Sequence, residues 1–123
     1  MEPYATHLRL FTVSLRGIFY SLMLHRYFVE LAYDGTRYHG WQVQKNAHTV
    51  QAEFNRALSI LAGQEVETLG AGRTDTGVHA RQFFAHFDVQ KMLRDAKKAA
   101  GMLNGILPPD IAVRRVFPVE HRW

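Results

Sequence analysis

Hydrophobic residues along 26–62 change from a strand period to a helix period. In 27–34 they are mostly β-branched or aromatic, and the run ends at the turn signal Asp34-Gly35-Thr36, which predicts a strand. Thr49 is a typical helix N-cap and Gly63 a typical terminator, so the pattern predicts a helix between them. Its apolar residues recur at spacings of three and four, at Val50, Phe54, Ala57, Leu58 and Leu61.

The remaining hydrophobic positions predict two strands, a helix and a final strand. Residues 65–69 are a short strand candidate, and 78–89 a longer one. Helical spacing returns over 92–107, and Pro108-Pro109 ends this helix before a last strand at 111–116. The predicted order is therefore β-α-β-β-α-β. The residues expected to share a buried face are Phe83, Ala85 and Phe87 on the long strand, and Leu93, Ala96, Ala100 and Leu103 on the helix.

This order of elements is that of the ferredoxin-like, or split βαβ, arrangement. It predicts an α+β fold in which two helices cover one face of a four-stranded antiparallel sheet. The other face stays open. Such a face serves either as an RNA platform or as a packing surface for a second copy or domain, and the fold alone does not choose between these uses.

The composition indicates a single compact domain with an excess of basic over acidic residues. The 123 residues contain no cysteine, which excludes a disulfide framework and a cysteine-based zinc site. The formal net charge of +4 favours a polyanionic partner. Most of the excess lies in 88–123. There, helical spacing predicts a basic stripe, which is either a solvated helix surface or an RNA contact, formed by Lys91, Arg94, Lys97 and Lys98.

Residues 1–25 differ from the rest of the chain. They are apolar and carry Arg9 and Arg16 against a single acid, Glu2. The longest uncharged run, 17–24, is too short to cross a bilayer, so we predict no membrane span. We interpret 1–25 as an atypical extension, either upstream of a true start at Met23 or a poorly ordered tail.

The densest cluster of informative residues is 70–80, with the sequence GAGRTDTGVHA. Its three glycines lie between two predicted strands and indicate a tight loop that brings backbone close to another group. The third glycine comes too late for a dinucleotide-binding fingerprint, and no Gly-Lys-Ser/Thr follows as in a P-loop. Asp75 lies at the tip of this loop.

Two interpretations of Asp75 are open. Its carboxylate can accept a nearby backbone N–H in an Asx turn, which is a purely structural role. Alternatively, Arg73 keeps the carboxylate ionised, attracts a phosphate, and leaves Asp75 ready to act as a covalent nucleophile. Arg73 can also be no more than a surface ion-pair partner, which would contribute little.

A second block, 33–44, reads YDGTRYHGWQVQ and mixes aromatic rings, amides and cations in the loop after the first strand. Such a mixture suits stacking and hydrogen bonding to nucleotides. Tyr38 and Trp41 either serve that purpose or fold back into the core. The amides of Gln42 and Gln44 are the stronger candidates for a contact with a nucleotide.

Metal and serine chemistry find little support in the sequence. The seven histidines include no HExxH motif or paired carboxylate–histidine spacing, so we expect no metal site. His79 and His86 differ by an odd number and would face opposite ways on one strand. No G-x-S-x-G nucleophile elbow is present.

Four blocks in the same order resemble the tRNA pseudouridine synthase A family. Residues 33–44 are similar to its YDGTxYxGWQxQ, and 49–58 to its TVQ-initiated helix. Residues 72–80 are similar to GRTDxGVHA, the most specific block, and 103–116 to LNxxLPxDIxVxxV. The resemblance covers 26 to about 121, and nothing similar covers 1–25.

The resemblance implies that Asp75 is the catalytic aspartate of uridine-to-pseudouridine isomerisation in the anticodon stem-loop of tRNA, at positions 38 to 40. Arg73 would enter the space that the everted base leaves and contact phosphates. Thr74 and His79 would shape the same loop, and with Gln42 they complete the expected substrate-binding set. No cofactor or metal is implied. The implied setting is cytoplasmic, with tRNA as partner and a homodimer as the full-length form.

The departure from the family is length, because its members pair two related α/β halves with the cleft between them. We therefore expect 26–118 to be the N-terminal half and 119–123 the start of the joining segment. The family's base-stacking tyrosine would fall beyond Trp123. The chain by itself is expected to be an incomplete, inactive fragment.

Two further function classes compete with this one. A non-catalytic RNA-binding module would keep the fold and the loop without the second half of the active site. An RNA-recognition motif is disfavoured because 82–89 lacks its K/R-G-F/Y-G/A-F signature. A small-molecule-binding regulatory domain of ferredoxin-like fold leaves the GRTDTGVHA loop unexplained.

Overall fold

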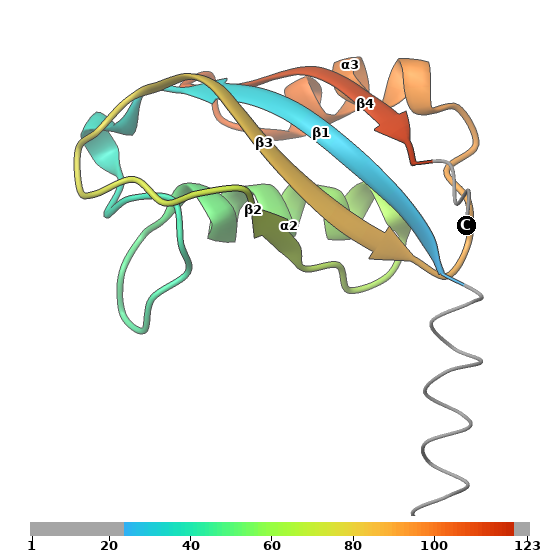
Figure 1. Ribbon diagram of the computed structural model, residues 1–123, viewed down its shortest axis with the longest axis horizontal. Helices are drawn as coiled ribbons and strands as arrows, with labels where there is room; N and C mark the ends of the chain where they lie inside the picture. Colours follow the sequence, from blue (N-terminus) through green and yellow to red (C-terminus); the bar gives the residue numbers. More distant parts are fainter. Residues whose placement is uncertain (1–23, 120–123) are drawn as a thin grey trace, which may run out of the picture.

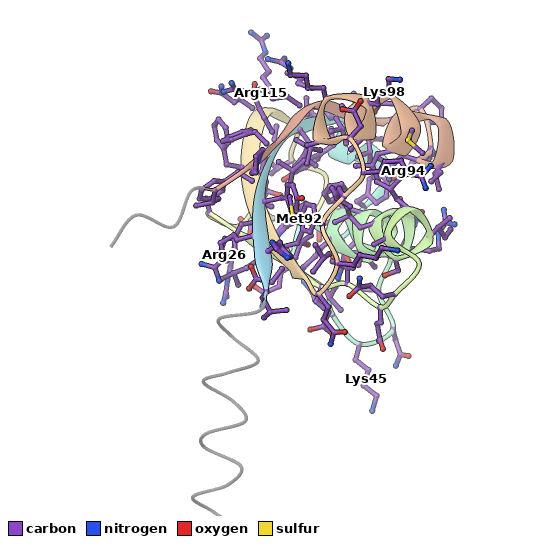
Figure 2. All side chains as sticks on the ribbon, turned by 90° about the vertical axis from the view of Figure 1, so that its right-hand side faces the viewer. Arg26, Lys45, Met92, Arg94, Lys98 and Arg115 are labelled. Atoms are coloured by element: carbon purple, nitrogen blue, oxygen red, sulfur yellow. The ribbon has the colours of Figure 1, made fainter. Side chains whose placement is uncertain are left out.

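A twisted antiparallel sheet with helices against one of its faces forms the part of the chain that the computed structural model describes, residues 24–119 (Figures 1 and 2). The elements follow in the order β1 (His25–Tyr33), η1 (Gly35–Arg37), α2 (Val50–Ala62), β2 (Thr68–Gly70), β3 (Ala80–Val89), α3 (Ala96–Ile106) and β4 (Ile111–Pro118). The predicted order is confirmed, with the short 3-10 turn η1 added after β1.

The spatial order of the strands is β2-β3-β1-β4, and every neighbouring pair is antiparallel. This arrangement confirms the predicted α+β, ferredoxin-like fold. Because β1 and β3 run in opposite directions, the end of β1 lies beside the start of β3, with Tyr33 opposite Ala80. The two loops that carry the most informative residues therefore leave the sheet at the same end.

The core lies between the sheet and the two helices. Alternate residues of the central strands face the helices, as the period of two requires. On β3 the expected face of Phe83, Ala85 and Phe87 is buried. On β1 the buried face consists of Tyr27, Val29, Leu31 and Tyr33, and the helices contribute Val50, Phe54, Ala57, Leu58, Ala99, Ala100 and Leu103.

The bounds of α2 follow its predicted signals. The Thr49 hydroxyl accepts the N–H of Ala52 at 3.3 Å, which satisfies one free donor of the first turn. Gly63 ends the helix in the left-handed region, at φ 67°, where glycine is favoured.

The other helix starts later than the pattern predicts, because Asp95 caps it. The Asp95 carboxylate accepts the N–H groups of Lys97 and Lys98, so α3 begins at Ala96. The predicted basic stripe is accordingly wrong for Lys91 and Arg94, which precede the helix. Arg94 and Lys98, both labelled in Figure 2, nevertheless line one hollow of about 420 Å³, together with Leu61 and Met102.

The β2 strand is shorter than predicted and displaced toward the loop. It spans three residues instead of 65–69, and just before it the backbone of Val66 bonds to α2, where the Ser59 hydroxyl accepts the Val66 N–H at 2.9 Å. Gln51 donates its amide N–H to the Thr68 carbonyl at 2.5 Å, and Asn55 accepts the Thr68 N–H at 3.0 Å. The long strand starts at Ala80 rather than 78, which leaves His79 in the loop and makes the comparison of His79 with His86 on one strand wrong.

The face of the sheet away from the helices carries aromatic rings and ion pairs. Phe28 lies 5.8 Å from Phe117 between ring centroids, and the Arg115 guanidinium lies over the Phe117 ring at 4.9 Å. Glu30 is only 7% exposed because Arg115 and Arg114 cover its carboxylate, at 2.8 and 3.6 Å. The hydrogen bond from Arg115 is the main reason why the pKa of Glu30 lies below its usual range, and Gln82 and the nearby Arg114 add to it against the effect of desolvation.

The predictions for the chain ends lie largely outside the described residues. Residues 1–23 and 120–123 are not described, so the extension at 1–25 and the joining segment at 119–123 stay predictions. Among residues 24–119, no helix is long and apolar enough to span a membrane.

Candidate active-site loop

The loop 71–79, between β2 and β3, lies against the loop that follows β1 (Figure 1). The Gly77 N–H donates to the Tyr38 carbonyl at 3.1 Å, and the Trp41 N–H donates to the Thr74 carbonyl at 3.4 Å. These two bonds flank Asp75 on either side. The two blocks singled out in the sequence thus form one structural unit.

Two glycines of the first block make this close approach possible. A Cβ on Gly35 would overlap the Val78 carbonyl oxygen, and a Cβ on Gly40 would overlap the Thr74 carbonyl oxygen. Gly40 also has φ +78°, a backbone region that side chains disfavour. Only glycine fits at both positions, because the neighbouring backbone occupies the space of a side chain.

Asp75 is exposed at the tip of the loop. Its backbone carbonyl accepts the Val78 N–H at 3.2 Å, which closes a turn. From residues 24–119 its carboxylate receives no hydrogen bond and no ion pair, so the Asx-turn interpretation is wrong. The carboxylate therefore has no structural task within this part of the chain.

Arg73 is also exposed, and within the described residues it forms no ion pair with Asp75. It lines a pocket of about 240 Å³ next to the loop, and Gln42 lines the same pocket. Trp41 and Leu69 contribute apolar surface there, and a Cβ on Gly72, which also lines the pocket, would have nothing within 4 Å. Arg73 and Gln42, two of the predicted substrate-binding residues, thus share one concave surface, formed in part by the loop that carries Asp75.

Thr74 faces inward rather than toward solvent. Its hydroxyl lies 2.7 Å from the Tyr33 hydroxyl, so the two groups share a hydrogen bond. Burial raises the pKa of Tyr33, and the bond to Thr74 opposes that effect. Thr74 therefore fixes the loop to β1.

His79 fixes the other end of the loop. Its Nδ1 accepts the Gly35 N–H at 2.9 Å and lies 3.1 Å from the Asp34 carboxylate. The hydroxyl and the N–H of Thr36 are the main reasons why the pKa of Asp34 lies below its ordinary value, and His79 adds to them. Both predicted residues, Thr74 and His79, contact the chain itself.

The aromatic rings of the second block belong to the core. Tyr38 and Trp41 are each 2% exposed, and Trp41 packs on Phe83 with centroids 4.5 Å apart. The packing interpretation of both rings is confirmed. Gln42 and Gln44, by contrast, are exposed.

The sequence reasoning missed one network in this region. The Tyr38 hydroxyl donates to Asp110 at 2.6 Å, and the Arg37 guanidinium donates to the same carboxylate at 2.9 Å. Burial and Asp110 both raise the pKa of Tyr38. In the sequence, Asp110 belongs to the block 103–116 and follows the prolines that end a helix, but no periodicity signals its tertiary partners.

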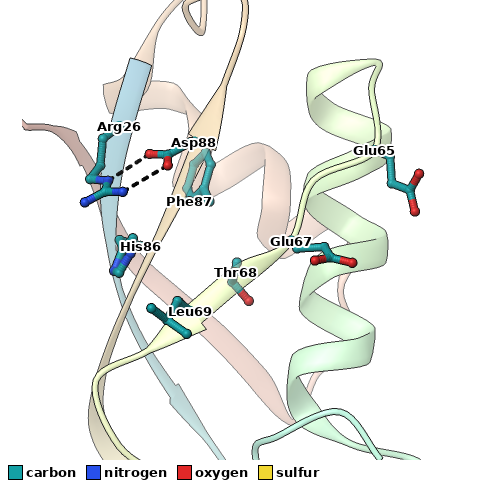
Figure 3. Close-up of a pocket in the computed structure, with 8 residues that line it drawn as sticks. All are labelled: Arg26, Glu65, Glu67, Thr68, Leu69, His86, Phe87 and Asp88. Atoms are coloured by element: carbon teal, nitrogen blue, oxygen red, sulfur yellow. Dashed lines mark hydrogen bonds and ion pairs between the residues drawn. The ribbon is translucent and has the colours of Figure 1, made fainter. Parts of the chain in front are cut away.

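A larger open groove, of about 660 Å³, lies farther along β3, between β3, β2 and the residues that precede β2 (Figure 3). Asp88 and Arg26 form a two-point ion pair on one side of it, at 2.8 and 3.0 Å. Glu65 and Glu67 lie on the other side. The two glutamates disfavour a polyanion in this groove.

Residues 31–122 match the family model described as tRNA pseudouridine synthase. The chain belongs to this family. The resemblance found in the four sequence blocks is thereby confirmed.

Individual family members show how much of the protein is covered. A tRNA pseudouridine synthase A of Bacteroides thetaiotaomicron is 53% identical over 97 residues, 79% of this chain and 36% of that protein. One of Bacteroides fragilis is 46% identical over 99 residues, 80% of this chain and 39% of that protein. The chain therefore spans less than two fifths of the length of these curated relatives.

Proposed function

We propose that this family member converts uridine to pseudouridine in the anticodon stem-loop of tRNA, at positions 38 to 40, with Asp75 as the catalytic residue. The observation that carries the proposal is the state of Asp75. Its carboxylate is exposed, is unused by the described chain, and stands on a loop held at both ends. A carboxylate with no structural task, on a fixed backbone, is available for chemistry.

The proposed reaction is an isomerisation in which nothing is added or lost overall. The bond between N1 of uracil and C1′ of ribose breaks, the base turns while bound, and a bond forms between C5 and C1′. The proton displaced from C5 is balanced by the one that N1 gains. Asp75 supports this either by attacking C1′ or by removing the C2′ proton to give a glycal.

The target base must leave its stack before the carboxylate reaches the sugar, at a cost of a few kcal/mol. Arg73 is suited to the space that the base leaves, because within residues 24–119 it has no ion-pair partner that it must give up. Gln42 lies on the same pocket and can donate to a base or phosphate. The proposal assigns these two side chains to RNA.

Thr74 and His79 belong to the proposed substrate-binding set in a different way. Their side chains bind Tyr33 and Gly35, so they hold the loop in the shape that presents Asp75. The imidazole edge of His79 remains exposed and can still contact RNA. We further propose that the full-length protein acts as a homodimer in the cytoplasm.

The test is tritium release from tRNA labelled at C5 of uridine, since C5 loses its hydrogen when it bonds to C1′. In a protein carrying this segment at full family length, Asp75→Ala should abolish release while tRNA binding persists. Glu67→Ala, which removes another exposed carboxylate, is the control and should keep full release. Turnover by Asp75→Ala would overturn the assignment.

The alternative, a non-catalytic RNA-binding module, predicts a different pattern. The unaltered protein would then bind tRNA with no tritium release, and Asp75→Ala would change neither quantity. The same two assays therefore separate the two functions.

A further inference from the structure

The position of Asp75 depends on backbone rather than on its own side chain. Its neighbours on both sides are bonded to 38–41, through Thr74 to Trp41 and through Gly77 to Tyr38. A shift of the Tyr38 backbone relative to the sheet would therefore also move the turn that carries the Asp75 carboxylate. The contacts that hold Tyr38 in place therefore also determine where this turn lies.

Tyr38 is held by a buried hydrogen bond as well as by packing. Its side chain is 2% exposed, and its ring lies 4.9 Å from the His48 ring between centroids. A buried phenol needs a hydrogen-bond partner, and Asp110 supplies one at 2.6 Å. A short hydrogen bond to an ionised carboxylate is among the stronger hydrogen bonds in proteins. It fixes the position and the orientation of the Tyr38 ring in the core.

Asp110 connects three points of the loop after β1 to the sheet. Its carboxylate binds the side chains of Tyr38 and Arg37, and its backbone carbonyl accepts the Asp34 N–H at 2.9 Å. It directly precedes β4, which pairs with β1 along most of its length. The Asp110 side chain is only 15% exposed, so water competes little for these bonds.

We propose that Asp110 and Tyr38 are positioning residues for the Asp75 carboxylate, acting through the bond from the Gly77 N–H to the Tyr38 carbonyl. The inference rests on the proposed function of Asp75. Neither residue lines the pocket of Arg73 and Gln42. They would therefore affect the reaction through the position of the Asp75 carboxylate, which changes kcat rather than the affinity for the substrate.

The first test measures geometry without turnover, by amide hydrogen exchange of the 123-residue chain at pH 7. Tyr38→Phe keeps the ring and removes only the hydroxyl, and Asp110→Asn keeps the shape and removes the charge. Both should speed exchange of the Gly77 N–H by about tenfold or more, beyond any change in the central amides of β1 and β3. The double variant should add little to either single one, because both act through one bond.

Asp88→Asn is the matched control. It also breaks a two-point carboxylate–guanidinium pair, with Arg26, but at the other end of β3. It should leave Gly77 exchange unchanged relative to the central amides. The proposal is overturned if Gly77 responds equally to all three single changes, or if Tyr38→Phe and Asp110→Asn leave it unaffected.

The second test separates positioning from binding by steady-state kinetics on tRNA, in the full-length background. Tyr38→Phe and Asp110→Asn should lower kcat by about tenfold to a hundredfold with KM nearly unchanged. A raised KM at constant kcat would overturn the assignment. If Asp75→Ala keeps turnover, the proposed function fails, whereas the exchange experiment still decides whether Asp110 and Tyr38 hold the loop.

Discussion

At the scale of single residues, the loop is built from groups that each have one defined contact. Thr74 and His79 use their side chains to join the loop to β1 and to η1, and Gly35 and Gly40 leave room for it. The side chains of Asp75 and Arg73, by contrast, receive no hydrogen bond or ion pair from the described residues. This division separates the residues that shape the loop from those left for a substrate.

Gly40→Ala tests the closeness of the two loops. The added methyl group would meet the Thr74 carbonyl at a backbone φ of +78°, so both strain and overlap oppose it. We expect a loss of about 2 kcal/mol in the free energy of unfolding, measured by urea denaturation. Gly72→Ala, where a Cβ has nothing within 4 Å, is the control and should be close to neutral.

Asp110 gives the stability of the fold a pH dependence. Burial raises its pKa, but the bonds from Tyr38 and Arg37 outweigh burial, so its folded-state pKa lies below the ordinary value. The stabilisation is therefore present above the unfolded pKa of about 4 and is lost as pH falls through the folded value. In urea unfolding, Asp110→Asn should be less stable than the unaltered chain at pH 7, and the difference should shrink toward pH 3. An equal difference at both pH values would contradict this account.

At the scale of elements, capping residues indicate the ends of the helices better than hydrophobic periodicity does. The hydrophobic pattern predicted that the second helix begins at 92, but it begins at Ala96. Asp95 is its N-cap, because the Asp95 carboxylate accepts the N–H groups of Lys97 and Lys98 in the first turn. Thr49 and Gly63, which the sequence did identify as end signals, set α2 at the predicted places. Capping residues act on their own helix, so they can be recognised locally.

Asp95→Ala should therefore weaken α3 specifically. Loss of the cap is expected to lower the free energy of unfolding by about 1 kcal/mol. Asp95→Asn should recover most of it, because an amide oxygen can also accept the Lys97 N–H. Thermal or urea unfolding of the two variants provides the comparison, and equal losses in both would show that the charge rather than the cap matters.

At the scale of the whole molecule, the sheet decides which loops meet. The antiparallel pairing of β1 with β3 places the ends of two sequence-distant blocks side by side, and β4 brings Asp110 to the same end. The basic balance of the chain is spread over several surfaces, including the α2–α3 hollow and the face that carries Arg115 (Figure 2). Such a spread of positive charge attracts polyanions in general, and Arg73 adds one cation at the pocket that it shares with Gln42.

The salt dependence of tRNA binding should show whether Arg73 binds a phosphate. If Arg73 binds a phosphate, Arg73→Ala should weaken binding and reduce the slope of log K against log salt by about 1. Arg56→Ala is the control, since Arg56 is exposed on α2 and paired with Glu53 at 3.1 Å. Filter binding or fluorescence titration at several salt concentrations measures both, and an unchanged slope for Arg73→Ala would assign it no phosphate.

The sequence by itself determined the order of the elements, the buried faces of the strands, the ends of α2 and the loop that carries Asp75. These features depend on residues close together in the chain, whose periodicity, capping and glycine content act locally. Only the tertiary structure decided that Tyr38 and Trp41 turn inward, that Thr74 and His79 bind the chain itself, and that Asp110 binds Tyr38. Those outcomes depend on which segments the sheet brings together, and Asp110 and Tyr38 become neighbours only when β4 pairs with β1.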